Sequence, residues 1–455
     1  YSAVAYLEQK QICSNIALVG VRGKAVQAPD GEKCYQLEDE FRVLENMKNT
    51  PKYWQKMKYE ILAKIDNLGA FQLFFTLSCA DQRWSANMAE IVMNRGFTVR
   101  FSRNRTNDDQ EPFIEVKTVD GNWKPLMQFI KEDVKESLQE LIRGNVVSAT
   151  RYFHHRVKSF INKILLARSN PLSVQYYSYK VEIQERGAPH VHGVIWLNLS
   201  ELENLYMVDG ELSNTRTSNE QPLKGIGEIF KKIKQSQKLT NEDKAVLVKW
   251  IDAFITVSTH PDTVGQDVAE IVRAVNKHHC TKTCRKHGTN CRFKYPKPPS
   301  PITIIQEPPK EGKEEKRNQS VAKGLATIRK VMDVLEDEKS IEKIMDKFTK
   351  ETETSKEMIK NRVRRIKMVC KMADVSYKDY IEALGITSSG YKVVLARDID
   401  ELQINPYNEE MIRAWNGNMD LQPVLDFFAV VTYVADYYAK DDTGMMELIK
   451  AATDD

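Results

Sequence analysis

The sequence lacks several features that would assign it to whole classes of protein. It has neither a run of 18 apolar residues nor an N-terminal leader with basic and apolar parts, so we expect no membrane insertion and no secretion through a signal peptide. A Gly-x-x-x-x-Gly-Lys-Ser/Thr phosphate loop is also missing, which excludes a nucleotide-driven motor in this stretch. No internal repeat stands out. Because the chain starts at Tyr1 rather than at methionine, we expect a fragment of a longer polypeptide.

Cysteine is scarce, with 7 in 455 residues, and it is unevenly spread. Three of the cysteines cluster at positions 280, 284 and 291. An odd and clustered set fits a reducing compartment and a local metal site better than a disulfide framework. We therefore expect no disulfides.

The net charge of +4 hides an asymmetry along the chain. Residues 398–455 hold 3 basic and 13 acidic side chains, a net charge of −10, which leaves +14 for the preceding 397 residues. Residues 277–300 hold seven Lys or Arg and no acid, and residues 356–371 hold seven against one Glu. Such basic runs favour binding of a polyanion, although a solvated helix face explains the second run equally well.

Hydrophobic periodicity predicts an α+β class, with strands over 71–78, 174–184 and 190–197, the last two joined as an antiparallel hairpin. The predicted helices cover 53–68, 131–143, 146–168, 226–254, 321–384 and 426–440. Residues 101–125 are polar and turn-rich, 198–219 form a polar insertion, and 296–319 resemble a linker rich in Pro, Lys and Glu. With 42% hydrophobic content, the chain is long enough for two or three domains.

His190 and His192 are two residues apart on a predicted strand, so their side chains project from one face. The facing strand offers Glu182 and Gln184, which share a face for the same reason, and either could complete a metal site. Two imidazole nitrogens and one oxygen suit Mg²⁺ or Mn²⁺ acting as a Lewis acid. A His-x-His pair alone is weak evidence, because surface and structural histidines often show this spacing.

Tyr433 and Tyr437 are four residues apart and so lie on one face of the last predicted helix, with Tyr438 beside them and Lys440 close by. A tyrosine can attack phosphorus and form a covalent phosphotyrosine, and two tyrosines allow two sequential transfers. The alternative is core packing, which is common for aromatic residues at this spacing on an apolar helix.

The segment His278-x-Cys280-x3-Cys284-x6-Cys291 has the most specific spacing in the chain. Four soft ligands within fourteen residues predict a structural zinc in closed tetrahedral coordination, with His279 and His287 as spare candidates. Basic side chains interleaved with these ligands are expected to bind phosphate, namely Lys282, Arg285, Lys286, Arg292 and Lys294. Trp84, after the first predicted strand, could meet a nucleotide, or it could belong to the core.

Taken together and in their order, these motifs resemble the N-terminal region of Helitron-type rolling-circle transposases, which contains an HUH endonuclease domain. The resemblance rests on residues 74–81, on Gln184 to His192, on the cysteine cluster with Arg292 and Phe293 after it, and on residues 433–440. It covers most of the chain. It implies a compact antiparallel sheet flanked by helices, the Rep-like palm, with the tyrosine helix packed beside the histidine strand.

The resemblance also implies roles for individual residues. His190 and His192 would bind a catalytic Mg²⁺ or Mn²⁺, and Tyr433 and Tyr437 would be paired nucleophiles. A viral and plasmid Rep pattern, with an acidic ligand eight residues before the first histidine, selects Glu182, with Gln184 as the alternative. Family members often have Lys before the second tyrosine. Here Asp436 stands there, so we expect Lys440 to compensate charge, and the choice between Tyr437 and Tyr438 stays open.

The implied activity is nicking and rejoining of single-stranded DNA at transposon ends and target, through a 5′-phosphotyrosine intermediate. A helicase domain in the same full-length polypeptide and a nuclear location are expected from the resemblance alone. Two other functions compete with this one: a non-catalytic zinc-stapled DNA-binding protein, and a plasmid or viral replication initiator.

These expectations divide the chain into six parts. They are an N-terminal DNA-binding and helical extension (1–68), the HUH endonuclease core (69–275), a zinc-binding segment (276–300), a linker (301–320), a helical region (321–425) and the tyrosine helix that completes the site (426–455).

Overall fold

The computed structural model describes residues 25–27, 33–35, 51–102, 113–167, 170, 172–183, 188–202, 206–208, 211–213, 225–280, 284, 291, 293–309, 314–348 and 355–426. The chain forms two units, one of residues 1–70, 143–150 and 427–455, the other of residues 71–142 and 151–426. In the first unit, β1 (Ala25–Gln27) pairs with β2 (Lys33–Tyr35), and α2 (Pro51–Leu68) confirms the helix predicted over 53–68. That helix ends at Gly69, whose φ of 82° a glycine adopts without strain.

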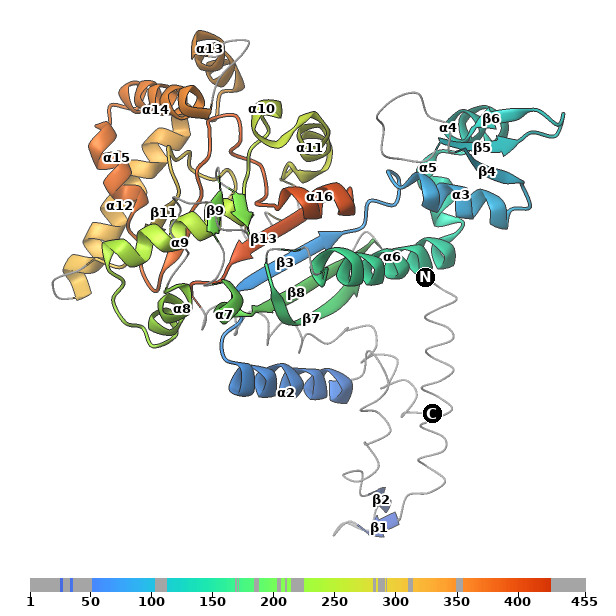
Figure 1. Cartoon of the computed structure of the whole chain (residues 1–455), viewed down its shortest axis with the longest axis horizontal. Helices are drawn as coiled ribbons and strands as arrows, with labels where there is room; N and C mark the ends of the chain where they lie inside the picture. The colour runs from blue at the N-terminus through green and yellow to red at the C-terminus, as the bar shows by residue number, and fades with distance from the viewer. Residues whose placement is uncertain are drawn as a thin grey trace. The chain divides into compact units, whose positions relative to one another are not determined.

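A four-stranded antiparallel sheet in the order β13-β3-β8-β7 is the centre of the second unit (Figure 1). Its strands are β3 (Leu73–Ser78), β7 (Val174–Ile183), β8 (Pro189–Leu197) and β13 (Met419–Pro423). The three predicted strands and the antiparallel pairing of the last two are therefore confirmed. The sequence did not predict β13, which joins the sheet beside β3 from far along the chain.

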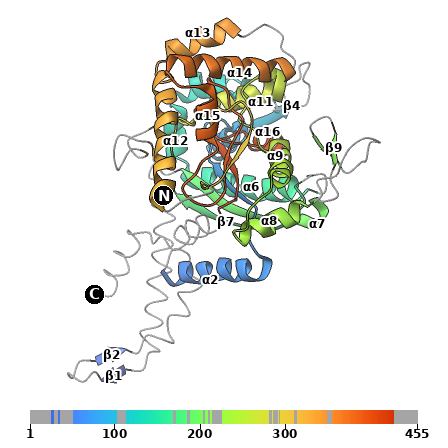
Figure 2. The same ribbon diagram turned by 90° about the vertical axis from the view of Figure 1, so that its left-hand side faces the viewer.

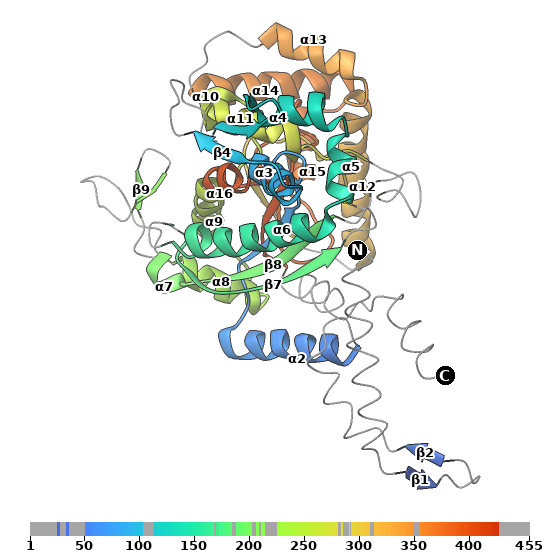
Figure 3. The same ribbon diagram turned by 90° about the vertical axis from the view of Figure 1, so that its right-hand side faces the viewer.

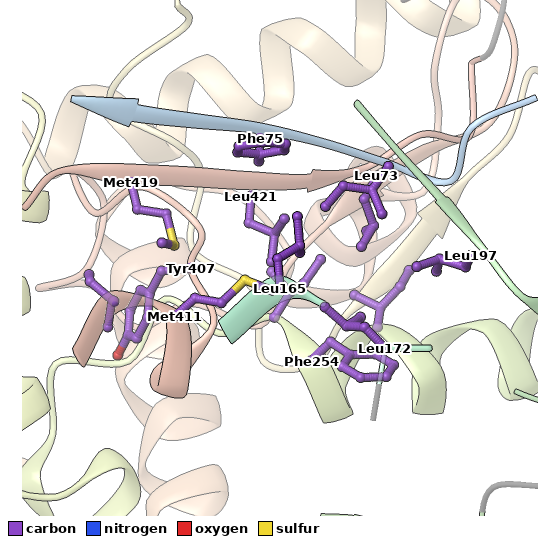
Figure 4. Packing of buried hydrophobic residues seen from close by; sticks show 14 of the residues in the cluster. Leu73, Phe75, Leu165, Leu172, Leu197, Phe254, Tyr407, Met411, Met419 and Leu421 are labelled. Atoms are coloured by element: carbon purple, nitrogen blue, oxygen red, sulfur yellow. The ribbon is translucent and has the colours of Figure 1, made fainter. Parts of the chain in front are cut away.

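The sheet divides its side chains between an apolar face and a polar face, because successive residues of a strand point to opposite sides. Leu73, Phe75 and Leu77 of β3 enter the main core together with Met419 and Leu421 of β13. Figure 4 shows Leu73, Phe75 and Leu421 directed toward the same interior. The residues between them on each strand face the other side, and that polar face carries the candidate site.

Helices cover the apolar face and extend the core. α6 (Val146–Phe160), continued by the π-helical turn η4 (Ile161–Leu165), runs alongside β7 and β8 (Figure 3). The predicted helices over 146–168 and 226–254 are confirmed, the latter as α8 (Ile226–Lys234) and α9 (Asn241–Phe254). The remaining elements of this part are α3 (Ser85–Asn94), α10 (Pro261–Val264), α11 (Gln266–Ile271), η5 (Val272–Asn276) and α16 (Glu409–Trp415).

The helix predicted over 131–143 is wrong as a single element. The chain instead forms α4 (Leu126–Phe129), η3 (Ile130–Val134) and α5 (Leu138–Arg143). The break occurs at Lys135, which adopts a left-handed conformation with φ 57°. Ser137 then starts α5, because its backbone N–H and hydroxyl both donate to the Glu140 carboxylate.

Two stretches expected to be polar loops contain strands. The stretch 101–125 holds the end of β4 (Val99–Ser102) and all of β5 (Phe113–Lys117) and β6 (Trp123–Pro125), which form a separate antiparallel sheet. The insertion at 198–219 holds α7 (Leu199–Leu202) and a pair of short strands, β9 (Tyr206–Val208) and β10 (Glu211–Ser213). Strand alternation among polar residues was too weak to be recognised in the sequence.

The helical prediction over 321–384 is confirmed by four helices that pack around a core of their own (Figure 2). They are α12 (Glu314–Val334), α13 (Glu338–Phe348), α14 (Ser355–Met372) and α15 (Tyr377–Leu384). The expected linker contains β11 (Ile304–Gln306), which pairs with β12 (Lys392–Val394). The class is α+β, as predicted. Among the described residues, no helix combines the length and apolar composition that a membrane span requires.

Candidate functional site

The polar face of the four-stranded sheet brings chemically active side chains into two rows. In the first row Ser78 of β3 stands opposite His190 of β8, which stands opposite Glu182 of β7. In the second row Asp420, Thr76, His192 and Lys180 follow one another across the four strands. Directly opposed residues point to the same side of a sheet, so both histidines share this face, as their spacing predicted.

His190 is held in a defined orientation by its neighbours. Its side chain is buried, with 8% of the residue exposed, and its Nδ1 lies 2.9 Å from the Ser78 Oγ. The Ser78 hydroxyl also donates to Asn418 Oδ1 at 3.3 Å. The ring of His192 lies beside that of His190, with 4.5 Å between the ring centroids. The two imidazoles therefore form one compact pair on the sheet.

Glu182 is the carboxylate closest to this pair in the predicted ligand set. Its Oε2 lies 3.5 Å from His192 Nε2, and it stands directly opposite His190 in the strand pairing. Gln184, the alternative third ligand, lies outside the described residues. The ligand atoms of Glu182, His190 and His192 do not all lie within 4.8 Å of one another. Among the described residues, two other groups of potential metal ligands, described below, do meet that distance. The two imidazoles and the carboxylate are therefore adjacent, but their ligand atoms do not converge on a single metal position.

Gly193 follows the histidine pair because nothing larger fits there. A Cβ at this position would come within 2.3 Å of the Phe75 ring, which stands opposite it on β3. The Phe75 ring thus packs directly on the backbone of β8. This contact fixes β8 against β3 immediately beside His192.

The second row includes a half-buried acid, Asp420, and a half-buried base, Lys297, lies near it. Burial raises the pKa of Asp420 to about 6, although nearby Lys297 and Arg397 oppose the shift. Burial lowers the pKa of Lys297 to about 8, while Asp420 opposes that shift. Oδ1 of Asp420 is shielded from solvent and has no hydrogen-bond partner among the described residues. The polar face therefore combines two imidazoles with a carboxyl and an amine that titrate nearer neutrality than usual.

The second constellation is the cysteine cluster. The ligand atoms of His278, Cys280, Cys284 and Cys291 all lie within 4.8 Å of one another. His278 Nε2 is 3.5 Å from Cys280 Sγ and 3.3 Å from Cys291 Sγ. A tetrahedral zinc with bonds of about 2.0 to 2.3 Å holds its ligand atoms roughly 3.5 Å apart. The four residues selected from spacing therefore form a group that could hold a metal such as zinc.

The surroundings of the cluster favour metal binding. Burial raises the pKa of the Cys291 thiol, but hydrogen bonds from the backbone of Tyr295 and Phe293 and from the other cysteines outweigh it, so the net pKa is lowered. Burial also lowers the pKa of His278, which favours the neutral ring. Neutral imidazole and thiolate are the metal-binding forms. The His278 ring stacks on Tyr295 with 4.4 Å between centroids.

A third group, His260, Asp398 and Asp400, also has converging ligand atoms. Here the charge is already compensated by protein. Arg365 Nε donates to Asp398 Oδ1 at 3.0 Å, and its Nη2 donates to Oδ2. Because this buried ion pair uses both carboxylate oxygens, we interpret the group as structural.

Several predicted site residues lie outside the described part of the chain. They are Tyr433, Tyr437, Tyr438, Lys440, Gln184, Lys282, Arg285, Lys286 and Arg292, with His287 among the spare ligands. Lys294 is described and exposed, which is compatible with its predicted phosphate contact. Spare His279 is also exposed and is not a member of the cluster.

Trp84 is a core residue. Only 1% of it is exposed, and its Nε1 donates to the backbone oxygens of Trp415 and Asn416. The Arg156 guanidinium lies 4.7 Å from its ring centroid. Stacking on a base needs an open ring face. The structure therefore does not support the predicted DNA contact at Trp84, and it selects the core alternative.

Sequence reasoning missed the residues that surround the histidine pair. Ser78 could have been found, because it continues the alternation of Phe74 and Thr76 on the polar face of the first predicted strand. Asn418 and Asp420 gave no such signal. They lie more than 220 residues beyond His190, and only the pairing of β13 with β3 brings them to the site.

Part of the chain, including the histidine pair, is similar to a known protein family. Residues 3–195 match the family model described as "Helitron helicase-like domain at N-terminus". The matched stretch includes β3, β7 and most of β8, and hence both histidines. No curated protein and no solved structure matches the chain. Residues 3–195 are therefore similar to the N-terminal region of Helitron-type proteins.

Proposed function

We propose that the chain is a metal-dependent endonuclease that nicks single-stranded DNA and transfers the strand, as part of a rolling-circle transposase. The observation that carries the proposal is the meeting of Glu182, His190 and His192 on one face of the central sheet. The family match over residues 3–195 supports a transposase-related role. The antiparallel sheet flanked by helices is compatible with the HUH palm proposed for this region.

The donor set fits a hard divalent cation. Two imidazole nitrogens and one carboxylate oxygen leave positions open for water and a phosphate oxygen, an arrangement that suits Mg²⁺ or Mn²⁺. When bound, such an ion withdraws charge from the scissile phosphate as a Lewis acid. His190 and His192 would hold it, with Glu182 or Gln184 as the third ligand.

Tyr433 and Tyr437 are the proposed nucleophiles. The phenolic oxygen of one tyrosine attacks phosphorus and loses its proton, the bond from phosphorus to the 3′ oxygen breaks, and that oxygen leaves as a protonated hydroxyl. The 5′-phosphate stays on the tyrosine, so the bond energy is conserved. Attack by a 3′-hydroxyl, or transfer through the second tyrosine, reverses the step and joins the ends. Tyr438 is the alternative second nucleophile, and Lys440 would balance charge at the phosphate.

We also propose that the cysteine cluster binds zinc and presents basic residues to the strand. Zinc would fix the turn that carries Lys282, Arg285, Lys286, Arg292 and Lys294. Lysine and arginine bind phosphates with little regard to base sequence. The proposed partners are transposon-end and target strands in the nucleus, with a helicase domain in the full-length polypeptide.

The experiment is an adduct assay. The protein is incubated with labelled single-stranded DNA from the end of its element and Mn²⁺, and the products are separated in SDS. We expect an SDS-resistant protein–DNA adduct that disappears when Tyr433 and Tyr437 are both changed to Phe. Tyr176→Phe is the matched control, because this tyrosine on β7 is 48% exposed and is not a proposed nucleophile.

The zinc cluster supports one competing function. If end sequences bind tightly but give no adduct, while zinc is present, the chain is a zinc-stapled DNA-binding protein and the endonuclease proposal fails. An adduct on a plasmid or viral origin, but not on transposon ends, would instead assign a replication initiator with the same chemistry.

A further inference from the structure

We infer that Ser78 and Asn418 are positioning residues that fix the tautomer of His190, so that its Nε2 lone pair is presented to the proposed divalent cation. The inference rests on the proposed metal site, but its central claim concerns the metal-free protein. It follows from a chain of hydrogen bonds that runs from a backbone carbonyl to the histidine ring. Each bond in that chain determines the direction of the next.

The first step is the orientation of the Asn418 amide. Its Nδ2 lies 2.9 Å from the backbone oxygen of Val275. A carbonyl oxygen can only accept a hydrogen bond, so the NH₂ end of the amide must face Val275. The carbonyl end, Oδ1, is therefore directed to Ser78.

The second step is the direction of the Ser78 hydroxyl. Ser78 Oγ lies 3.3 Å from Asn418 Oδ1, which has no proton to give. Ser78 must donate its single proton to that oxygen. Its lone pairs are then directed to its other neighbour, His190 Nδ1, at 2.9 Å.

The third step is the state of the histidine. A hydroxyl that accepts from Nδ1 requires a proton on Nδ1, and a neutral imidazole has only one N–H. The lone pair is then on Nε2. The opposite tautomer would need Ser78 to donate to Nδ1, which would leave two oxygens facing each other without a proton. In a largely buried site such a loss is costly.

The relay is held rigidly by the surrounding backbone. The Ser78 N–H donates to the Asn418 backbone oxygen at 2.9 Å, and Trp415 Nε1 donates to the Ser78 backbone oxygen at 2.9 Å. Gly417 permits this approach, because a Cβ there would lie 3.0 Å from Trp415 Nε1. A neighbour that fixes the ring nitrogen opposite the metal is a frequent means of orienting a ligating histidine. Here that neighbour is Ser78, and it is oriented in turn by Asn418, which directly precedes β13 and lies 340 residues away from Ser78 in sequence.

The test is the tautomer of His190, measured by NMR on metal-free protein with ¹⁵N-labelled histidine, at a pH well above the titration range of an ordinary histidine. The chain has only 8 histidines, so the signal is assigned by its absence in His190→Gln. We expect Nδ1 to carry the proton in the wild type. Ser78→Ala and Asn418→Ala should populate the Nε2–H form and weaken Mn²⁺ binding by about 10- to 100-fold. Ser78→Thr keeps the hydroxyl and should keep both properties.

Gln266→Ala, which removes an exposed amide on α11 that contacts Glu270, is the control and should change neither property. The inference is overturned if wild-type His190 carries its proton on Nε2, or if Ser78→Ala leaves tautomer and Mn²⁺ affinity unchanged. Its failure is separable from that of the proposed function. An Nδ1–H tautomer without Mn²⁺ binding or adduct formation sinks the endonuclease proposal alone, whereas adduct formation with an Nε2–H tautomer sinks the relay alone.

Discussion

The cysteine cluster and the histidine pair are two candidate metal sites built in opposite ways. All four cluster ligands fall within fourteen residues, from His278 to Cys291, and their ligand atoms already converge. The histidine pair is assembled across a sheet, with Glu182 on β7, the histidines on β8 and their support from β3 and Asn418. A site whose ligands are close in sequence can be predicted from the spacing of those ligands, whereas a site on a sheet depends on the pairing of distant strands.

The ligand chemistry differs as much as the construction. Three sulfurs and one nitrogen suit zinc in a closed site, which contributes to folding. Two nitrogens and a carboxylate suit a hard cation that keeps open positions for a reaction. We therefore expect the two sites to respond independently to substitution. A change in the cysteine cluster should affect local structure, whereas a change in the histidine pair should affect cation binding and activity.

The largest effect is expected from Cys284→Ser. Structural zinc contributes on the order of 10 kcal/mol to folding in isolated zinc-finger peptides. Elemental analysis should find about one zinc per wild-type chain and almost none in the variant. Hydrogen exchange should show loss of protection in residues 276–300, because the turn loses the ion that would fix it.

Cys370→Ser is the matched control, since Cys370 is buried in the α12–α15 bundle and is not a ligand. It should keep the zinc. If the wild-type protein holds no zinc, or if both variants lose it equally, the cysteine cluster is not a structural zinc site.

The second effect is expected from His192→Ala. The variant loses one nitrogen ligand of the proposed Mg²⁺ or Mn²⁺ site, and we expect Mn²⁺ affinity to fall by at least about 100-fold. Electron paramagnetic resonance of free Mn²⁺ measures the binding, and zinc content should remain about one per chain. His155→Ala removes an exposed histidine on α6 and should leave both metals unaffected.

A His192→Ala variant that also lost its zinc would show that the two sites are coupled, which would contradict the expected independence of the two sites. Unchanged Mn²⁺ binding would remove His192 from the ligand set and leave the proposed cation site without support on β8.

How far the sequence predicts the fold depends on where each signal lies. Strands β3, β7 and β8 were predicted because they are apolar and β-branched or aromatic, with turn residues at their ends. β13 was not, because its alternation is only five residues long and includes Asp420 and Gln422. The break at Lys135 also escaped prediction, since a left-handed lysine carries no distinct sequence signal.

The candidate site follows the same rule. His190, His192 and the cluster ligands were predicted from spacing, because each set is close together in the chain. Trp84 was ambiguous, since a tryptophan after a strand can stack on a base or fill a core, and only its burial against Trp415 decides. Asn418 could not be predicted, because its role comes entirely from the registers of three strands.

The smallest effect, and the finest test of the sheet face, is the pH dependence of stability at Asp420. Burial raises its pKa to about 6 from an ordinary value near 3.9, so the folded state binds the proton more tightly than the unfolded chain. The folded state therefore loses stability as pH rises from about 4 to 6. Asp420→Asn removes this loss and should raise the free energy of unfolding at neutral pH by up to about 3 kcal/mol, with little change below pH about 4.

Urea unfolding of wild type and variant at two pH values, one below the ordinary pKa of Asp and one near neutrality, measures the difference. A gain that is equal at both pH values would mean that repacking, not the charge, is responsible. A loss at neutral pH would mean that the carboxylate is needed beside Lys297 and Arg397, which oppose its pKa shift. Since neither site's ligands change, zinc content and Mn²⁺ affinity should stay constant, and a fall in Mn²⁺ affinity alone would extend the hard-cation site along the second row to β13.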